Sequence, residues 1–299
     1  MRELKAFTLR NVKLFFKDKG TFFTSLITPM ILLVLYVTFL GKVYRDSFLL
    51  SFPEGIAIDK KIADGFVGGQ LLSSLLAVCS VTVAFCSNML MVQDKLTGAG
   101  NDLSLTPVKP QVTAAGYYLA TFFSTLIVCL CACVVGLIYL AFVGWYASVL
   151  DIVALLLDVV LLVAFGTAFS SIINCFLSTQ GQISAVGTVV SAGYGFLCGA
   201  YMPISQFGVA IQNAVVFLPG TYGTSLLRNH ALNGVFTELS AKGFPPETIT
   251  ALRDSVDANL NFFGRSLSVG DMYAVLVGSV VLLLGAFIAV HAFCKMKKR

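Results

Sequence analysis

Long stretches without a charged residue decide what this chain can fold into. Five segments of 21 to 69 residues contain no Asp, Glu, Lys or Arg: 21–41, 65–93, 111–150, 159–227 and 272–294. About 20 consecutive apolar residues allow an α-helix to cross the hydrocarbon core of a bilayer. Backbone polar groups in lipid must also be hydrogen-bonded within the protein, which a helix achieves by itself. The sequence therefore predicts an all-α integral membrane protein that crosses the bilayer several times.

The composition excludes several classes of protein. Only 12% of the residues are charged, compared with about 25% in soluble domains. The net charge of +5 is too small and too scattered for a nucleic-acid partner. The chain has two histidines and no GxxxxGK[ST] run, so we expect no catalytic residues, no metal site and no cofactor in it. A membrane enzyme would also need a set of catalytic side chains on one membrane face, and none is apparent.

The uncharged segments predict six transmembrane helices. We place them at 21–41, 65–93, 111–143, 151–177, 183–201 and 272–294. The apolar piece 204–218 is short for a crossing, and it lies between Pro203 and Pro219, which break helices. If it crossed, the basic C-terminal residues 295–299 would lie outside, against the positive-inside rule. We therefore predict a re-entrant external hairpin after the fifth helix.

The basic residues predict the orientation. With both termini cytoplasmic, twelve of the twenty Lys and Arg residues lie inside, and the outer loops pair the other eight with acidic residues. This distribution follows the positive-inside rule. We expect a multi-pass protein of the cell (plasma) membrane.

Residues 1–19 have the pattern of an amphipathic helix. Leu4, Phe7, Leu14 and Phe15 lie on one side, and basic residues occupy the other. Such a helix lies in the membrane interface and contacts lipid headgroups or a cytosolic partner. The alternative is a basic flank that only sets the topology.

Two polar segments lie between the predicted spans. The inner loop 94–110 contains scattered leucines; Asn101 or Asp102 would cap a short helical turn, which Pro107 and Pro110 would end. We predict that it is a docking surface for a soluble subunit. The outer segment 222–270 predicts a helical cap, with one helix that begins at 245–247 because Pro and Glu suit a first turn.

Small and polar residues form a stripe on two of the predicted spans. The second span carries them at steps of three and four: Gln70, Ser73, Ser74, Ser80, Ser87 and Asn88. The fifth span has a matching face that includes Ser184, Thr188 and Ser191. Small residues allow membrane helices to approach closely, and polar ones bond them together. Packing explains both stripes, and a polar translocation path is the sharper hypothesis.

Asp158 is an acidic residue that membrane-buried residues flank closely on both sides. An intramembrane carboxylate is a functional candidate by default. The sequence shows no basic or second acidic partner near it, which favours a structural role over a proton relay. An ion-coupled secondary transporter that uses Asp158 is the alternative function.

Several short motifs resemble one family when they are taken in order. They are Arg10-Asn-Val-Lys-Leu-Phe-Phe-Lys17, Leu103-Ser-Leu-Thr-Pro107-Val108, Gly199-Ala-Tyr-Met-Pro203 and Leu218-Pro219-Gly-Thr-Tyr222-Gly. Over essentially the whole chain, the pattern resembles the permease subunits of ABC-2-type exporters. In that family a second proline is common soon after the one that corresponds to Pro203, and residues 204–207 of this chain contain none.

The resemblance implies a single transmembrane domain over residues 1–299. It implies that residues 1–19 form a connecting helix, that 222–270 form an external cap, and that spans two and five line the path. It further implies a cytosolic ATP-binding subunit that binds ATP and Mg, and a second permease copy or paralogue. The coupling residues implied in the loop 94–110 are Asp94, Lys95, Asp102, Leu103 and Leu105. We expect the substrate to be an amphipathic or hydrophobic molecule, whether a drug, peptide, lipid or glycan.

Overall fold

The computed structural model describes residues 2–52, 58–106 and 108–296, which form helices almost throughout. The elements in chain order are α1 (Arg2–Lys17), α2 (Lys19–Leu35), the π-helix η1 (Tyr36–Leu40), α3 (Gly41–Leu50), α4 (Lys60–Leu96), α5 (Ala99–Leu105), α6 (Pro110–Val143), α7 (Val149–Phe176), α8 (Gln180–Leu197), the 3₁₀-helix η2 (Ile204–Gln206), α9 (Val209–Val215), α10 (Pro219–Ala241), α11 (Pro246–Ser255), β1 (Asn261–Phe262), β2 (Arg265–Ser266) and α12 (Val269–Met296).

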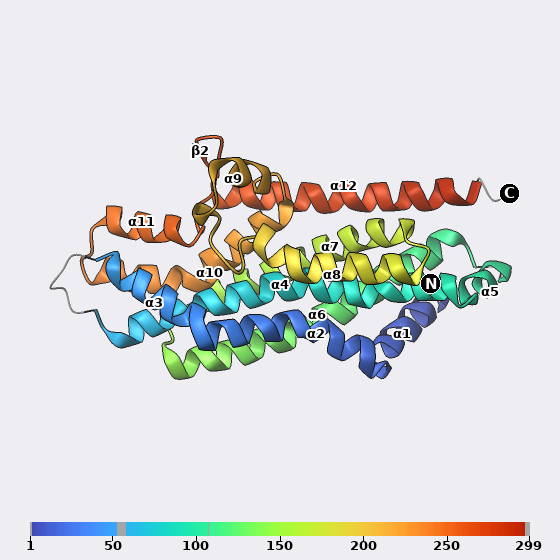
Figure 1. Cartoon of the computed structure of the whole chain (residues 1–299), viewed down its shortest axis with the longest axis horizontal. Coiled ribbons are helices and arrows are strands. Elements are labelled where there is room, and N and C mark those ends of the chain that lie inside the picture. The colour runs from blue at the N-terminus through green and yellow to red at the C-terminus, as the bar shows by residue number, and fades with distance from the viewer. Residues whose placement is uncertain (1, 53–57, 107, 297–299) are drawn as a thin grey trace.

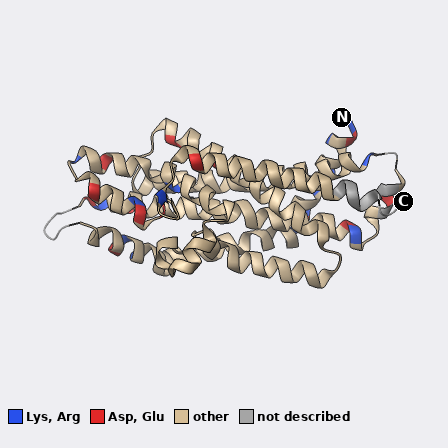
Figure 2. Cartoon of the chain, turned by 90° about the horizontal axis from the view of Figure 1, so that it is seen from above, with Lys and Arg blue, Asp and Glu red and all other residues tan. Residues whose placement is uncertain are grey.

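The long helices lie roughly parallel and make the molecule elongated (Figure 1). The helices α1 and α5 and the C-terminal part of α12 lie at one end, which we call the α5 end. The helix α11 lies at the opposite end, the α11 end. Figure 2 shows that the charged residues gather toward these two ends and leave the middle of the bundle largely uncharged. This distribution suits a protein whose middle section lies in a bilayer.

Five helical segments of the described residues are long and apolar enough to cross a membrane. They are Lys19–Leu50, Lys60–Leu96, Pro110–Val143, Val149–Phe176 and Val269–Val290. They correspond to the first four predicted spans and to the last one. The prediction of an all-α membrane protein is therefore confirmed. The first segment is longer than predicted, because α2 continues through η1 into α3 without a break.

The predicted fifth span, 183–201, corresponds to the unbroken helix α8, which begins and ends a few residues earlier than predicted. The helix α8 ends at Leu197, and η2 and α9 follow before α10 begins. Pro203 precedes η2, and Pro219 is the first residue of α10, so both prolines lie at helix starts, as their fixed φ favours. We call residues 198–218 the break. Six crossings and a re-entrant hairpin remain predictions.

The outer segment 222–270 contains more helix than the sequence indicates. Most of α10 falls in it, and α10 packs along α4, α7 and α12. The predicted helix near residue 246 is confirmed as α11, which ends at Ser255. That this segment lies outside the cell remains a prediction.

The helix α4 forms the centre of the bundle. It packs against α2, α6, α7, α8 and α10, and most of its side chains are buried. Small residues allow this contact, because a Cβ atom at Gly166 of α7 would lie 2.4 Å from the Ser80 carbonyl oxygen of α4. Close helix contacts of this kind are favoured where lipid supplies no hydrophobic driving force.

We expect Gly166→Val to destabilise the bundle. The valine has no space against the α4 backbone, and overpacking of this kind costs about 1–3 kcal/mol. The matched control is Gly278→Val in α12, where an added Cβ would meet no atom within 4 Å. Thermal unfolding of both purified variants in detergent checks this. An equal Tm for the two variants would contradict the close approach of α7 to α4.

Candidate functional site

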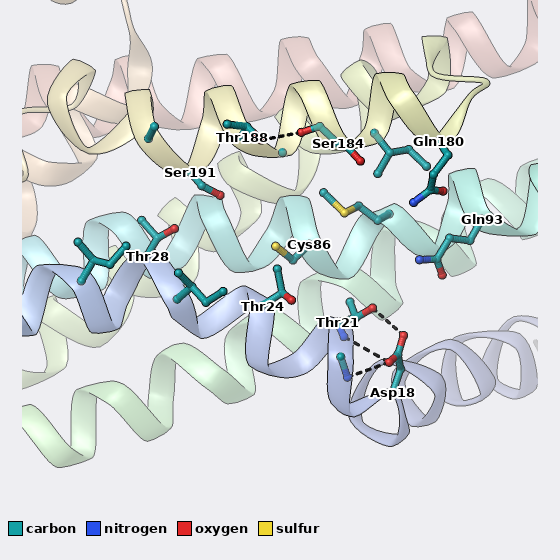
Figure 3. Close-up of a pocket in the computed structure, with 17 residues that line it drawn as sticks. Asp18, Thr21, Thr24, Thr28, Cys86, Gln93, Gln180, Ser184, Thr188 and Ser191 are labelled. Carbon is teal, nitrogen blue, oxygen red and sulfur yellow. Dashed lines mark hydrogen bonds between the residues drawn. The ribbon is translucent and has the colours of Figure 1, made fainter.

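A groove of about 690 Å³ lies between α2 and α8, with α4 behind it (Figure 3). Figure 3 draws the seventeen residues that line it. They are Asp18, Gly20, Thr21, Thr24, Ile27, Thr28, Ile31, Cys86, Met89, Gln93, Gln180, Ile183, Ser184, Gly187, Thr188, Ser191 and Ala192.

The walls of the groove combine hydroxyl groups with apolar surface. Thr21, Thr24 and Thr28 of α2 lie across from the hydroxyl residues of α8 (Figure 3). The spacing of three and four residues puts each set on one side of its helix. Isoleucine and methionine side chains fill the positions between them. A ligand with both polar and apolar parts fits such a lining.

One end of the groove carries a negative charge. The Asp18 carboxylate caps α2 and accepts hydrogen bonds from the Thr21 hydroxyl at 2.6 Å and from the Gly20 N–H at 3.0 Å. These hydrogen bonds, the Thr21 hydroxyl first, lower the pKa of Asp18 below its usual value. Asp18 is the only Asp, Glu, Lys, Arg or His among the lining residues, so an uncharged or cationic ligand is favoured there.

The structure separates the two predicted stripes. Ser184, Thr188 and Ser191 of α8 line the groove. The six stripe residues of α4 are at most 6% exposed. They are buried inside the chain, and none of them lines the groove.

Hydrogen bonds satisfy several polar groups of the buried α4 stripe. The Ser80 hydroxyl donates to the Leu76 carbonyl at 2.7 Å, and Ser73 donates to the Gln70 carbonyl at 3.0 Å. The Asn88 amide donates to Ser170 and Ser171 of α7. The stripe residues Ser74 and Ser87 are buried with them.

The residues that α4 contributes to the groove are Cys86, Met89 and Gln93, which the sequence analysis did not select. It also missed the three threonines of α2. The spacing of these threonines within an apolar span, three and four residues, could have indicated a polar face on α2. The hydroxyl residues of α8 have the same kind of spacing.

Two of the predicted coupling residues hold helices together at the α5 end. Asp94 is buried, forms an ion pair with Arg10 of α1 at 3.0 Å and accepts a hydrogen bond from the Tyr117 hydroxyl of α6 at 2.6 Å. The hydrogen bond to Asp94 raises the pKa of Arg10. The Lys95 ammonium donates to the carbonyls of Asn174 and Cys175 at the end of α7, where a cation complements the helix dipole.

The other coupling residues lie on α5, the short helix predicted between 101 and 107. It begins at Ala99, after Gly98 turns the chain with a φ of +83°. Asp102 is exposed, and Leu105 is 86% exposed. Leu103 also belongs to α5, and its side chain lies outside the described residues. This end of the molecule therefore presents an exposed leucine beside an acidic residue.

Asp158 has partners, so the expectation that it lacks a basic neighbour is wrong. Its buried carboxylate lies 2.6 Å from Nδ1 of His230 on α10 and accepts a hydrogen bond from the Tyr273 hydroxyl of α12 at 2.5 Å. The sequence did not reveal them because they are 72 and 115 residues away. The carboxylate joins α7, α10 and α12.

The sequence analysis missed a buried ion pair that fixes the break. Arg228 of α10 is fully buried and donates to Asp257 at 3.0 Å and to the Gly199 carbonyl. With its amide oxygen turned toward Arg228, Gln70 accepts from Nε and Nη2, both at 3.2 Å. Asp257 also accepts from the Ile204 N–H at 2.6 Å. A single arginine at the end of a 69-residue uncharged stretch was the available signal.

A model of the family described as "ABC-2 type transporter" matches residues 2–231. The chain belongs to the ABC-2 type transporter family. No curated protein matches the chain. The protein is therefore a membrane permease component of an ABC transport system, and it is not itself catalytic. Permeases of this family generally pair with ATP-binding subunits.

The matched residues of the permease include the groove, α5 and the break. They end within α10, after Arg228 and before Asp257. The ion pair thus joins the matched region to the part of the chain that follows it.

We expect Arg228→Gln to destabilise the permease by about 3–5 kcal/mol, because it leaves a buried carboxylate without its charge partner. Lys242→Gln is the control, since Lys242 forms an exposed pair with Glu238 at 3.7 Å, and such pairs are worth at most about 1 kcal/mol. The double variant Arg228→Gln/Asp257→Asn should lose less stability than the sum of its single changes. Thermal unfolding of the wild type, Arg228→Gln, Asp257→Asn, the double variant and Lys242→Gln checks this, and additive losses would show that the two side chains are not coupled.

Proposed function

We propose that this permease is the transmembrane subunit of an ATP-driven ABC exporter. It moves an amphipathic or hydrophobic substrate, such as a drug, peptide, lipid or glycan, out of the cell. The groove between α2 and α8 is the observation that carries this proposal. Its volume of about 690 Å³ is within the range of about 300–1,000 Å³ for small-molecule sites, and its lining joins hydroxyl groups to apolar side chains.

A second permease copy or paralogue completes the path in this proposal. It packs against the exposed sides of α2 and α8, so that Ser184, Thr188 and Ser191 face the substrate. The buried α4 stripe from Gln70 to Asn88 supports the path from behind. It does so through the hydrogen bonds of Asn88 to α7 and of Gln70 to Arg228 of α10.

The α5 end is the cytoplasmic side in this proposal. The distribution of basic residues supports it, since both termini and α5 then lie inside the plasma membrane. The exposed surface of Asp102 and Leu105 receives the ATP-binding subunit, which binds ATP and Mg. Asp94 and Lys95 transmit the motion, because they tie α4 to α1, α6 and α7.

Family membership favours this function over an ion-coupled carrier. Asp158 then has a structural role, consistent with its two hydrogen bonds to neighbouring helices. Asp158 is also buried and is not among the residues that line the groove.

Thr188→Trp should block the path without unfolding the permease. We expect uptake of a fluorescent amphipathic dye into inverted membrane vesicles to fall about tenfold or more, which corresponds to about 1.4 kcal/mol. The control is Val189→Trp, on the neighbouring residue of α8, which is exposed and does not line the groove. Equal transport by the two variants would remove the groove from the path.

Leu105→Asp should uncouple ATP turnover from transport. The carboxylate replaces an exposed apolar contact on α5, where charge is unfavourable at the core of a protein interface. Leu105→Met keeps the apolar surface and serves as the control. We expect the Asp variant to retain less than about a tenth of the co-purified ATP-binding subunit, a loss of about 1.4 kcal/mol in binding. Full co-purification and coupled transport would contradict docking at α5.

A further inference from the structure

The β-hairpin before α12 holds an aromatic side chain at its tip. The strands β1 and β2 pair with Phe262 opposite Arg265, and the turn residues Phe263 and Gly264 have φ angles of +47° and +86°. Two-residue turns with positive φ at both positions normally take Asn or Asp before Gly, because bulky residues are disfavoured in the left-handed region. Phe263 is nevertheless 62% exposed. The positive φ and the exposure of the ring to water are both unfavourable for phenylalanine, and this combination points to a binding role for Phe263.

The hairpin tip is part of a larger aromatic cluster. Phe217, in the break just before α10, lies 5.6 Å from Phe262 and 5.9 Å from Phe263 between ring centroids. Phe217 is itself 65% exposed. The helix α9, beside β2 in Figure 1, exposes Val209 and Ile211. We call Val209, Ile211, Phe217 and Phe263 the aromatic patch. It links the hairpin to the break.

The patch lies at the start of a membrane-spanning helix. The apolar span Val269–Val290 of α12 begins three residues after β2, a distance of about 10 Å at most for an extended chain. Ser268 and Asp271 cap this helix through reciprocal hydrogen bonds of 2.9 to 3.2 Å, which marks the polar boundary. Beyond it, α12 exposes Val281 and Leu282, which a bilayer covers. The hairpin that carries Phe263 therefore leads directly into an apolar helix that is long enough to cross the membrane.

The charge near the patch suits a phospholipid headgroup. Arg265 is exposed on β2 beside Phe263, whereas residues 198–218 carry no charge. Aromatic side chains concentrate at the membrane–water interface, and an arginine there reaches lipid phosphates. A polar protein partner would need more hydrogen-bonding groups than these side chains supply.

We propose that the aromatic patch inserts into the interfacial layer of the bilayer and binds phospholipid at the boundary between headgroup and acyl chain. Phe217 and Phe263 enter the acyl region, and Arg265 remains at the phosphates. The insertion holds the break at a fixed depth in the membrane, because Phe217 belongs to the break. This proposal does not depend on the substrate or on the direction of transport.

Tryptophan fluorescence in vesicles tests the proposal. The chain has one tryptophan, Trp145, so Trp145→Phe gives a silent background in which Phe263→Trp is the only emitter. The full-length permease is reconstituted into phosphatidylcholine brominated either near the headgroup or near the end of the acyl chain. We expect a blue-shifted emission. Bromines near the headgroup should quench it about twofold more strongly than bromines near the end of the acyl chain, because aromatic residues concentrate at the membrane–water interface.

Lys242→Trp in the same background is the matched control. Lys242 is an exposed residue between α10 and α11, toward the α11 end, and its tryptophan should emit as in water without quenching. Phe217→Trp is a second reporter if Phe263→Trp does not fold, and it should behave like Phe263→Trp.

Three results would overturn the proposal. The first is quenching at Phe263→Trp no greater than at Lys242→Trp, which would leave the patch in water. The second is stronger quenching by the bromines near the end of the acyl chain, which would place the aromatic patch in the membrane core. The third is an unquenched, blue-shifted emission that shifts to the red when the permease is diluted with lipid, which would show a second copy covering the patch.

Discussion

The ion pair between Arg228 and Asp257 is the interaction on which the geometry of the break, residues 198–218, depends. A buried guanidinium is tolerated only where acceptors surround it, and Asp257, Gln70 and the Gly199 carbonyl supply them. The same carboxylate accepts the backbone N–H of Ile204. Two backbone groups of the break, the Gly199 carbonyl and the Ile204 N–H, thus have hydrogen-bond partners inside the protein, as buried non-helical backbone requires.

Fixing the break also arranges what lies on either side of it. The helix α8 stops at Leu197 and presents its hydroxyl residues to α2, whereas α10 continues along α4 and α7. Asp158 adds a second tie, since it joins α7 to His230 of α10 and Tyr273 of α12. Polar contacts between helices therefore decide the geometry of a bundle whose lipid-facing surface is apolar. The groove residues of α8 precede the break in the chain, and Phe217 of the aromatic patch lies near the C-terminal end of the break.

The positions of most helices could be predicted from the sequence, but the side-chain contacts between distant helices could not. Pro203 and Pro219 were predicted as helix breaks, and each lies at the start of a new helix in the structure, because a fixed φ and a missing N–H act locally. Asp94 was predicted as a coupling residue of a docking loop, whereas in the structure it is buried and contacts Arg10 and Tyr117 at the α5 end. The stripe on α4 was recognised as polar. Its helical spacing alone does not show whether it packs against another helix or lines a translocation path. The partners of Asp158 and Arg228 are 29 to 158 residues away, beyond any local pattern.

The sequence by itself determined that this chain is an all-α membrane protein, because uncharged stretches of 21 residues or more have few other stable solutions in water or lipid. It also determined the short helix α5 and the family resemblance, which rest on local order along the chain. Only the tertiary structure decided that α8 and α2 form the groove, that the α4 stripe is buried, and that α10 carries a paired arginine. These features depend on which helices meet, and contact between distant segments is set by the packing of the whole bundle.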